Sequence, residues 1–224
     1  VPGLEDAEVL RREVRRGAHR FDFLLNLRGR ETLLEVKSCT LFEGRTAMFP
    51  DAVTERGRRH LEALARAAGE GTPAAVLFLI HGDRATRFLP DYHTDLAFAR
   101  TLLAVRDRVR VLAASVAWDE NFSLPDRARS VAIPWTVAAR EARDGGAYLI
   151  VLRLRRPQRI VIGALGGLAL RAGYYVYAGS ARRGLSARIA RHTRLRKRPH
   201  WHIDFLRARA ECTAALPVRS QDDL

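Results

Sequence analysis

The first half of the chain contains apolar runs of strand length and one segment with apolar positions at helical spacing. Residues 21–27 and 32–42 are rich in apolar, β-branched and aromatic side chains, and the charged segment 28–31 between them contains a glycine. This pattern predicts a β-hairpin with a glycine turn. Residues 54–68 place apolar side chains at i, i+3, i+4 and i+7, and Gly69 follows, which predicts a helix and its end.

Three further segments extend this unit. The continuous apolar run 74–80 has the length of a strand and no polar face, which is typical of a strand buried on both sides. Residues 95–105 predict a second helix, and residues 109–118 predict another strand. Strands and helices that alternate in this way predict a mixed sheet flanked by helices.

The apolar periodicity lapses between residues 119 and 145, where prolines and alternating charges predict a linker with room for one short element. We therefore expect a domain over 1–120, a linker over 121–143 and a second domain over 144–224. The elements expected in the second domain are strands over 147–154, 159–163 and 173–178, a basic helix over 184–195 and another helix around 201–215.

The composition fits two small packed domains in a reducing compartment. The chain has 224 residues and only two cysteines, too few for a disulfide framework or a four-thiolate zinc site. No apolar run approaches the roughly 20 residues that a membrane-spanning helix needs. The first residues are acidic where a secretory signal would be basic and then apolar. We expect a cytoplasmic protein without a membrane span.

Basic charge is concentrated in the last third of the chain. The net charge is +14; residues 144–224 hold 16 Lys and Arg against 5 Asp and Glu, whereas residues 1–143 hold 23 against 20. Cationic side chains that neutralise phosphates release condensed counterions and thereby gain binding free energy, so DNA or RNA is the expected partner. A solvated basic surface without a specific partner is the alternative.

Two carboxylates and one lysine are expected to meet on the predicted hairpin. Glu35 and Lys37 project from one face of a strand, and a turn about Gly29 and Arg30 would set Asp22 opposite position 37 on that face. Two hard oxygen ligands can hold Mg²⁺ or Mn²⁺, and the lysine can orient or deprotonate the water that attacks a phosphodiester. Taken alone, the same set can be a salt-bridged sheet face in solvent.

Three motifs carry a family resemblance over about the first half of the chain. The segments 20–25 (RFDFLL), 34–38 (LEVKS) and 49–61 (FPDAVTERG, with HL two residues later) closely resemble the sugar fermentation stimulation protein A family. In the third segment, Asp51 or Thr54 could cap the helix that follows, and Asp51 could equally contact substrate.

This resemblance implies a PD-(D/E)XK nuclease core and a DNA-binding, nuclease-like protein. Asp22, Glu35 and Lys37 stand at the matching catalytic positions, with Asp22 and Glu35 as metal ligands. Glu13, on a stretch expected to be helical, could add a carboxylate that faces the metal. The family carries an OB-fold-like domain ahead of this core, and the residues before position 11 are too few to form one.

A second resemblance covers about residues 145–206. The segments 146–148 (GAY), 177–181 (YAGSA), 185–192 (LSARIARH) and 200–206 (HWHIDFL) resemble the GIY-YIG nuclease superfamily. The match is strongest to a GIY-YIG-like domain of uncharacterised function that is sometimes fused to the family above.

Chemistry and this second resemblance together point to catalytic roles for Tyr148, Tyr177 and Arg188. Two tyrosines on adjacent strands can bring phenolic oxygens to a phosphate, the arginine can clamp developing negative charge, and Gly179 can let the backbone approach the phosphate. Half-buried tyrosines beside a solvated basic helix are the alternative. The residues expected to bind nucleic acid are Arg182, Arg183, Arg191, His192, Arg194, Arg196, Lys197, Arg198 and His200.

The metal ligand of this second domain is not fixed by the sequence. GIY-YIG nucleases use a glutamate, for which Asp204 or Glu211 would have to stand in, so the domain could bind nucleic acid without cutting it. His200, His202 and Asp204 could also share zinc, but structural or phosphate-contacting roles are favoured because only two imidazoles and one carboxylate are available locally.

Together these patterns predict an α/β (α+β) protein, with a mixed-sheet PD-(D/E)XK nuclease-like core followed by a small GIY-YIG-like α+β domain. The expected function is Mg²⁺- or Mn²⁺-dependent hydrolysis of DNA or RNA. A non-catalytic DNA-binding regulator that uses both nuclease-like folds as binding platforms is the second hypothesis.

Overall fold

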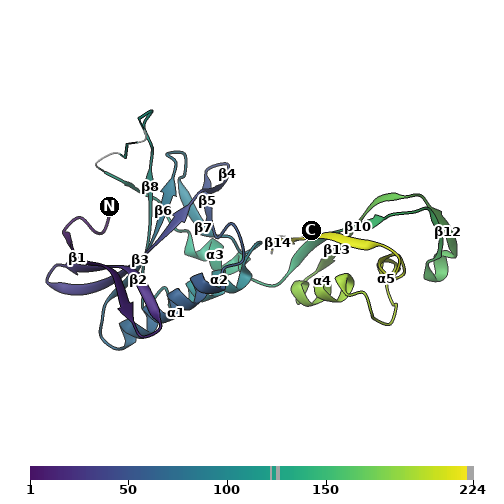
Figure 1. The fold of residues 1–224 in the computed structure, drawn as a ribbon, viewed down its shortest axis with the longest axis horizontal. Helices are drawn as coiled ribbons and strands as arrows, with labels where there is room; N and C mark the ends of the chain where they lie inside the picture. The colour runs from purple at the N-terminus through teal and green to yellow at the C-terminus, as the bar shows by residue number, and fades with distance from the viewer. Residues whose placement is uncertain (122, 125–126, 221–224) are drawn as a thin grey trace. The chain divides into compact units, whose positions relative to one another are not determined.

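The computed structural model describes residues 1–121, 123–124 and 127–220, and the chain divides into two compact units. Unit 1 is Val1–Ala142 and unit 2 is Arg143–Leu224. Both units combine helices with sheets (Figure 1), which confirms the expected α+β class. In the described ranges, no helix has the length and apolar character that crossing a bilayer requires.

A six-stranded mixed sheet forms the centre of unit 1. Its strands are β1 (Ala7–Arg16), β2 (His19–Leu27), β3 (Arg30–Cys39), β6 (Ala74–His81), β8 (Arg110–Val116) and β9 (Arg129–Ser130). Their order in the sheet follows this sequence; β6 pairs in parallel with β3 and β8, and the outer pairs are antiparallel. Six of the eight residues of β6 are buried, which explains its continuous apolar run.

Three helices and a small second sheet complete unit 1. The elements are α1 (Glu55–Gly69), α2 (Leu96–Val105), α3 (Trp135–Glu141), β4 (Leu41–Glu43), β5 (Thr46–Phe49) and β7 (Arg87–Pro90). Thr54 is the N-cap of α1, because its Oγ1 accepts a hydrogen bond from Gly57 N at 3.0 Å. Asp51 is exposed and does not cap this helix. The largest apolar cluster of the unit includes Leu61 and Leu64 from α1.

The turn between β2 and β3 lies one residue earlier than the sequence predicted. Leu27 pairs with Arg30, so Arg28 and Gly29 are the two turn residues, with φ of 53° and 79°. Positive φ at both central residues is the pattern of a type I′ turn, whose twist matches that of the strands. A one-residue shift of the turn moves the cross-strand partners by two, so Asp22 comes level with Glu35 rather than with position 37.

Two segments of unit 1 differ from expectation. The stretch that includes Glu13 is the strand β1 and not helical, because it pairs along most of its length with β2. The expected linker over 121–143 contains β9 and α3 in its described part. Val131 and Ala138 in that part are buried, so the segment packs as part of unit 1.

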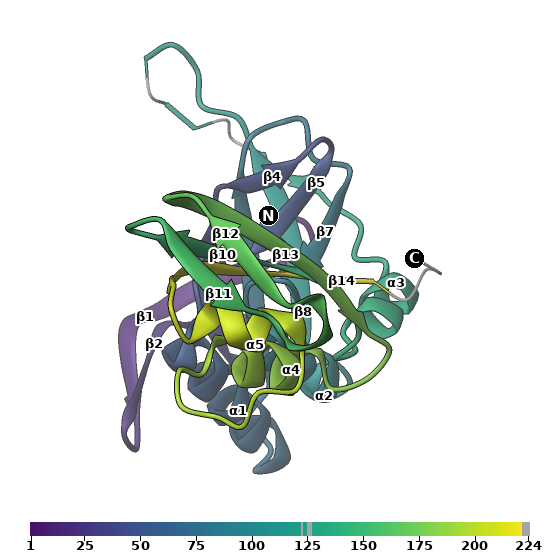
Figure 2. The ribbon, with the colours of Figure 1, turned by 90° about the vertical axis from the view of Figure 1, so that its right-hand side faces the viewer.

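A three-stranded antiparallel sheet is the framework of unit 2. Its elements are β10 (Gly146–Leu154), β11 (Gln158–Val161), the short 3-10 helix η1 (Gly163–Leu165), β12 (Gly167–Leu170), β13 (Gly173–Ala181), α4 (Leu185–Thr193), α5 (His202–Arg207) and β14 (Glu211–Arg219). The sheet order is β13-β10-β14, and β11 pairs with β12 separately. Helix α4 packs against this sheet, and α5 lies beside α4 (Figure 2).

The prediction of a helix around 201–215 is wrong for the second half of that segment. Helix α5 ends at Arg207, and residues from Glu211 onward form the edge strand β14. Pairing with β10 therefore overrides the helical propensity of this alanine-rich stretch. Pro217 is compatible with the edge of a sheet because proline lacks the N–H that an interior strand would need.

Candidate functional site

Glu35 is the centre of the polar cluster in unit 1. Strand β3 projects Glu35 and Lys37 from one face, and Lys37 Nζ lies 2.5 Å from Glu35 Oε1. His60 of α1 contacts the same carboxylate oxygen through its Nδ1. Glu35 is only 3% exposed, and buried carboxylates are costly unless charged or polar partners surround them.

The second oxygen of this carboxylate has no such partner. Glu35 Oε2 is buried and accepts no hydrogen bond from any described residue. Because most buried polar atoms in native proteins are satisfied, a buried carboxylate oxygen without a hydrogen-bond partner calls for a specific explanation. The atom is therefore a candidate ligand position.

Asp22 contacts the same part of β3, but through a hydrogen bond to the backbone that the sequence did not predict. Its Oδ2 accepts a hydrogen bond from Val36 N at 2.7 Å, so the carboxylate lies against the backbone between Glu35 and Lys37. Its Oδ1 has no hydrogen-bond partner among the described residues. The structure thus brings the three predicted residues to one stretch of β3, with one free carboxylate oxygen on each acid.

Sequence reasoning gave no role to His60. The residue lies on the buried face of α1, is 6% exposed, and places its ring 6.0 Å from the rings of both His19 and Phe21. The available signal was its helical spacing, because His60 precedes Leu61 and Leu64 on the apolar face of the predicted helix. A polar side chain at such a position needs a buried partner, and Glu35 is that partner.

Glu13 does not join this cluster. Its side chain is 70% exposed on β1, with its carboxylate 3.6 Å from Arg20. An exposed ion pair of this kind contributes little to stability.

Unit 2 gathers its predicted tyrosines around a buried histidine. The ring of Tyr148 lies 6.2 Å from that of Tyr177 and 5.9 Å from that of His192. Tyr148 is 1% exposed, and burial raises its pKa to about 12, with a further contribution from Tyr177. A phenol that is sealed from solvent and holds its proton so firmly is poorly placed to relay a proton from water.

His192 is also sealed from solvent. It is 1% exposed, and burial lowers its pKa although Asp204 acts in the opposite direction. The imidazole is therefore neutral at pH 7 and packs as part of the aromatic cluster. Its predicted contact with nucleic acid would require it to leave this core.

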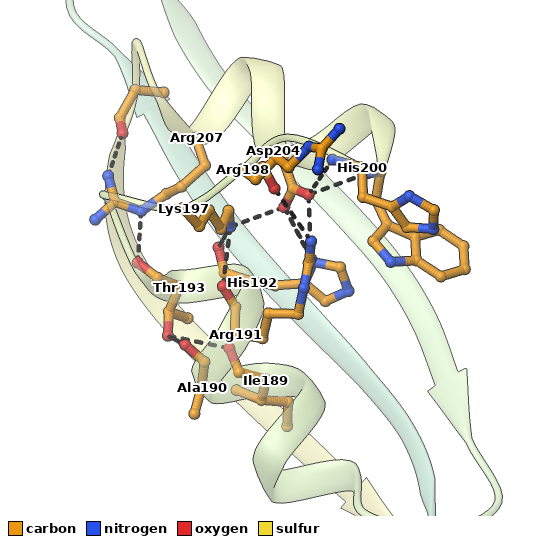
Figure 3. Close-up of polar contacts among 12 residues, drawn as sticks. Ile189, Ala190, Arg191, His192, Thr193, Lys197, Arg198, His200, Asp204 and Arg207 are labelled. Atoms are coloured by element: carbon orange, nitrogen blue, oxygen red, sulfur yellow. Dashed lines mark hydrogen bonds and ion pairs between the residues drawn. The ribbon is translucent and has the colours of Figure 1, made fainter. Parts of the chain in front are cut away.

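Asp204 is the hub of a buried ion-pair cluster (Figure 3). Its carboxylate lies 2.8 Å from Lys197 Nζ and 3.1 Å from Arg191 Nη1, and it accepts hydrogen bonds from the backbone amides of His200 and Trp201. Burial raises the pKa of Asp204, but these partners outweigh burial and hold the pKa well below its usual range. Its contacts suit a structural role rather than that of a metal ligand.

The basic residues predicted to bind nucleic acid separate into two groups. Arg191 and Lys197 are engaged with Asp204, and Lys197 also donates to the carbonyl oxygens of Arg191 and His192. The side chain of Lys197 is only 7% exposed, so its charge is neutralised inside the unit by Asp204. The predicted residues that remain exposed are Arg182, Arg183, Arg194, Arg196, Arg198 and His200.

Arg188 lies at the edge of the aromatic cluster. Its guanidinium carbon is 5.6 Å from the ring centroid of Trp201, and its Nη1 donates to Ser180 O at 3.0 Å. In the described part of the chain, no three His, Cys, Asp or Glu side chains surround a common point. His200, His202 and Asp204 thus form no ready zinc site.

Comparison with known proteins places this geometry in a family. A sequence profile described as the sugar fermentation stimulation protein RE domain matches residues 1–122. The chain belongs to the sugar fermentation stimulation protein family. A second profile, for the domain of unknown function DUF123, matches residues 147–224, and both resemblances noted in the sequence are thereby confirmed.

Individual relatives match part of this chain. A sugar fermentation stimulation protein homolog from Methanothermobacter thermautotrophicus is 42% identical over 129 residues, which cover 57% of this chain and 54% of the relative. A homolog from Chloroflexus aurantiacus is 51% identical over 98 residues, which cover 43% of this chain and 38% of the relative. The chain therefore spans about half the length of the curated relatives that it matches.

A solved structure shares the fold of part of this chain. The structure of Pyrococcus furiosus SfsA in complex with Ca²⁺ superposes with a TM-score of 0.55 at 28% sequence identity, covering 59% of this chain and 58% of that chain. The description of that structure names a hard, oxygen-preferring cation as its bound ion.

Proposed function

We propose that unit 1 is a metal-dependent phosphodiesterase that cleaves DNA or RNA, with Asp22 and Glu35 as metal ligands and Lys37 as the catalytic lysine. The observation that carries this proposal is the buried, unpartnered Oε2 of Glu35 beside the ammonium group of Lys37. A purely structural ion pair would be expected to satisfy both carboxylate oxygens, because an unsatisfied buried oxygen costs free energy.

The donor set fits Mg²⁺ or Mn²⁺. Glu35 Oε2 belongs to β3, and Asp22 Oδ1 belongs to a β2 side chain whose other oxygen, Oδ2, is held by Val36 N of β3; within the described residues neither oxygen accepts a hydrogen bond. Mg²⁺ commonly binds to one or two carboxylates and keeps several waters, whereas zinc prefers four nitrogen or sulfur ligands. The Ca²⁺ named for the Pyrococcus furiosus relative belongs to the same class of hard cation.

Each side chain has a role in such a reaction. A divalent cation bound here would offset charge on the phosphoryl oxygens and acidify a bound water. Lys37, with a side chain 15% exposed, is close enough to solvent to orient a water and to offset charge in the transition state. His60 contacts the same oxygen of Glu35 as Lys37 does and so is a positioning residue.

Cleavage of supercoiled plasmid and of a labelled single-stranded oligonucleotide by the full chain tests this proposal. We expect cleavage with Mn²⁺, none in EDTA, and a loss of about 100-fold in Glu35→Gln and in Lys37→Met. Glu62→Gln is the matched control, because Glu62 is an exposed carboxylate on α1. Activity that survives in EDTA, or in both site variants, would refute the proposal.

A second candidate function is a non-catalytic nucleic-acid-binding regulator. The specific observation in its favour is that unit 2 concentrates exposed arginines while its Tyr148 and Asp204 are buried and engaged. This candidate predicts binding that depends steeply on salt and survives chelation of divalent ions. Binding that requires a metal ion would count against it.

A further inference from the structure

Trp201 is an exposed aromatic side chain in the most basic part of unit 2. The residue is 41% exposed, yet its backbone is fixed, because Trp201 N donates to the buried carboxylate of Asp204 at 3.0 Å. A tryptophan side chain gains much free energy from burial, so one held at the surface needs a reason. The hydrogen bond to the buried carboxylate of Asp204 thus helps to hold Trp201 in this position.

The groups around the indole suit a flat ligand. The guanidinium of Arg188 lies over the ring at 5.6 Å, and the exposed imidazole of His200 stands edge-on at 5.3 Å and 88°. The ring of His192 contacts the indole from the interior at 6.1 Å. Indole, imidazole and guanidinium groups are those on which unpaired nucleobases stack in nucleic-acid-binding proteins.

The charge of the segments before and after α4 suits phosphates. Five exposed arginines come from the two segments that flank α4, and within the described residues none of them forms an ion pair. They are Arg182, Arg183, Arg194, Arg196 and Arg198. Arginines that are not neutralised within the protein remain available for the phosphates on either side of a stacked base.

We propose that Trp201, with the guanidinium of Arg188 over its ring, is a stacking site for an unpaired nucleobase, so that unit 2 prefers single-stranded over duplex nucleic acid. The inference rests on the proposed function only in taking nucleic acid as the ligand, and it holds whether or not unit 1 cleaves. A base inside a duplex is covered by its neighbours and cannot offer its face to Trp201 without being unstacked. The arginines bind phosphates of either form, and Trp201 supplies the selectivity.

Fluorescence anisotropy of the full chain in EDTA tests this proposal without cleavage. The probes are a fluorescein-labelled oligothymidylate of about 20 nucleotides, longer than one site of this kind, and a duplex of equal length. We expect Trp201→Ala to weaken binding of the single strand about tenfold, Trp201→Phe to retain most of it, and duplex binding to change less than about twofold. The salt dependence of binding should stay unchanged, because no phosphate contact is removed.

Trp118→Ala is the matched control. Trp118 is also exposed, at 48%, but it stacks on His81 in unit 1 at 5.8 Å. Trp118→Ala should leave the affinity for the single strand and the affinity for the duplex unchanged. Equal losses for single strand and duplex in Trp201→Ala, or no loss, would overturn the stacking site; failure of the unaltered chain to bind either probe would overturn the nucleic-acid ligand itself.

A second measurement leaves Trp201 in place. The chain has three tryptophans, so a Trp118→Phe, Trp135→Phe variant leaves Trp201 as the only one. Oligothymidylate should quench its fluorescence at saturation, and the duplex should quench it much less, because only an unpaired base can stack on the indole. Equal quenching by both probes would contradict the proposal.

Discussion

The ring of Tyr148 on β10 occupies the space that a side chain at Gly179 on β13 would need. The two residues are cross-strand partners, and a Cβ built on Gly179 would lie 2.5 Å from Cζ of Tyr148. The sequence suggested that this glycine admits a phosphate to the backbone. The structure gives a packing reason inside the protein instead, since the glycine makes room for a fully buried aromatic ring.

Gly179→Ala should therefore destabilise unit 2. The added methyl group would collide with the hydroxyl end of the buried Tyr148 ring, which cannot move aside without disturbing the aromatic cluster, and overpacking of this kind costs about 1–3 kcal/mol. Urea denaturation is the measurement. Gly69→Ala at the end of α1, where a Cβ would meet nothing within 4 Å, is the control and should not destabilise the protein.

How much could be read from the sequence depended on whether the decisive interaction was local. The capped start of α1 and the strand β6 were predicted because spacing and apolar content act within one segment. The turn at Arg28 was misplaced by one residue, because a positive φ at a non-glycine residue leaves no compositional mark.

The sequence predicted which residues form the candidate site but not how their side chains contact one another. Asp22 and Glu35 were expected as neighbours on one face, yet the hydrogen bond from Val36 N to Asp22 follows from a strand register that no pattern fixed. His60 and Asp204 acquire their roles only when distant segments fold together. Burial, which makes Asp204 an ion-pair hub, is a property of the assembled unit.

His60 is expected to tune cleavage by positioning Glu35. His60→Ala removes the contact to the buried carboxylate, so Glu35 can rotate, and a metal site formed by it should weaken. We expect a rise of about tenfold or more in the Mn²⁺ concentration that gives half-maximal cleavage. His60→Asn, whose amide nitrogen can replace Nδ1, should restore most of the affinity. An unchanged Mn²⁺ requirement in His60→Ala would remove this role.

Asp204 should make the stability of unit 2 depend on acid pH. Because the folded-state pKa of Asp204 is lowered, its contribution is present above the unfolded pKa of about 3.9 and is lost as pH falls through the lower folded value. Asp204→Asn should cost about 3–5 kcal/mol at pH 7, since it leaves the buried ammonium group of Lys197 without its anionic partner. The variant should also lack this part of the stability loss below about pH 4.

Urea denaturation at pH 7 and pH 3, followed by the fluorescence of Trp201 as the only tryptophan, measures both effects. Glu211→Gln is the control. Glu211 is an exposed carboxylate whose pKa is lowered by a hydrogen bond from Arg155, so little change in stability is expected at pH 7. Equal stability of Asp204→Asn and the unaltered chain at pH 7 would show that the buried ion pairs do not hold unit 2 together.

The exposed arginines after α4 should determine how binding responds to salt. Replacing Arg194, Arg196 and Arg198 together with alanine removes three cations that form no ion pair within the described residues. Each lost phosphate contact lowers the slope of log affinity against log salt by about 0.9 for duplex DNA, so the slope should fall by roughly 2 to 3. Anisotropy titrations between low and moderate salt, in EDTA, measure this slope.

A control variant that loses the same charge in unit 1 distinguishes an effect of the surface of unit 2 from an effect of the net charge of the chain. Arg11, Arg12 and Arg15 are exposed on β1 of unit 1, and their joint replacement with alanine removes the same total charge. If phosphates are held by unit 2, this second triple variant should keep most of the original slope, because the slope counts the phosphates that are neutralised and those contacts remain in place. Equal losses of slope in the two triple variants would mean that no particular surface of unit 2 holds the nucleic acid.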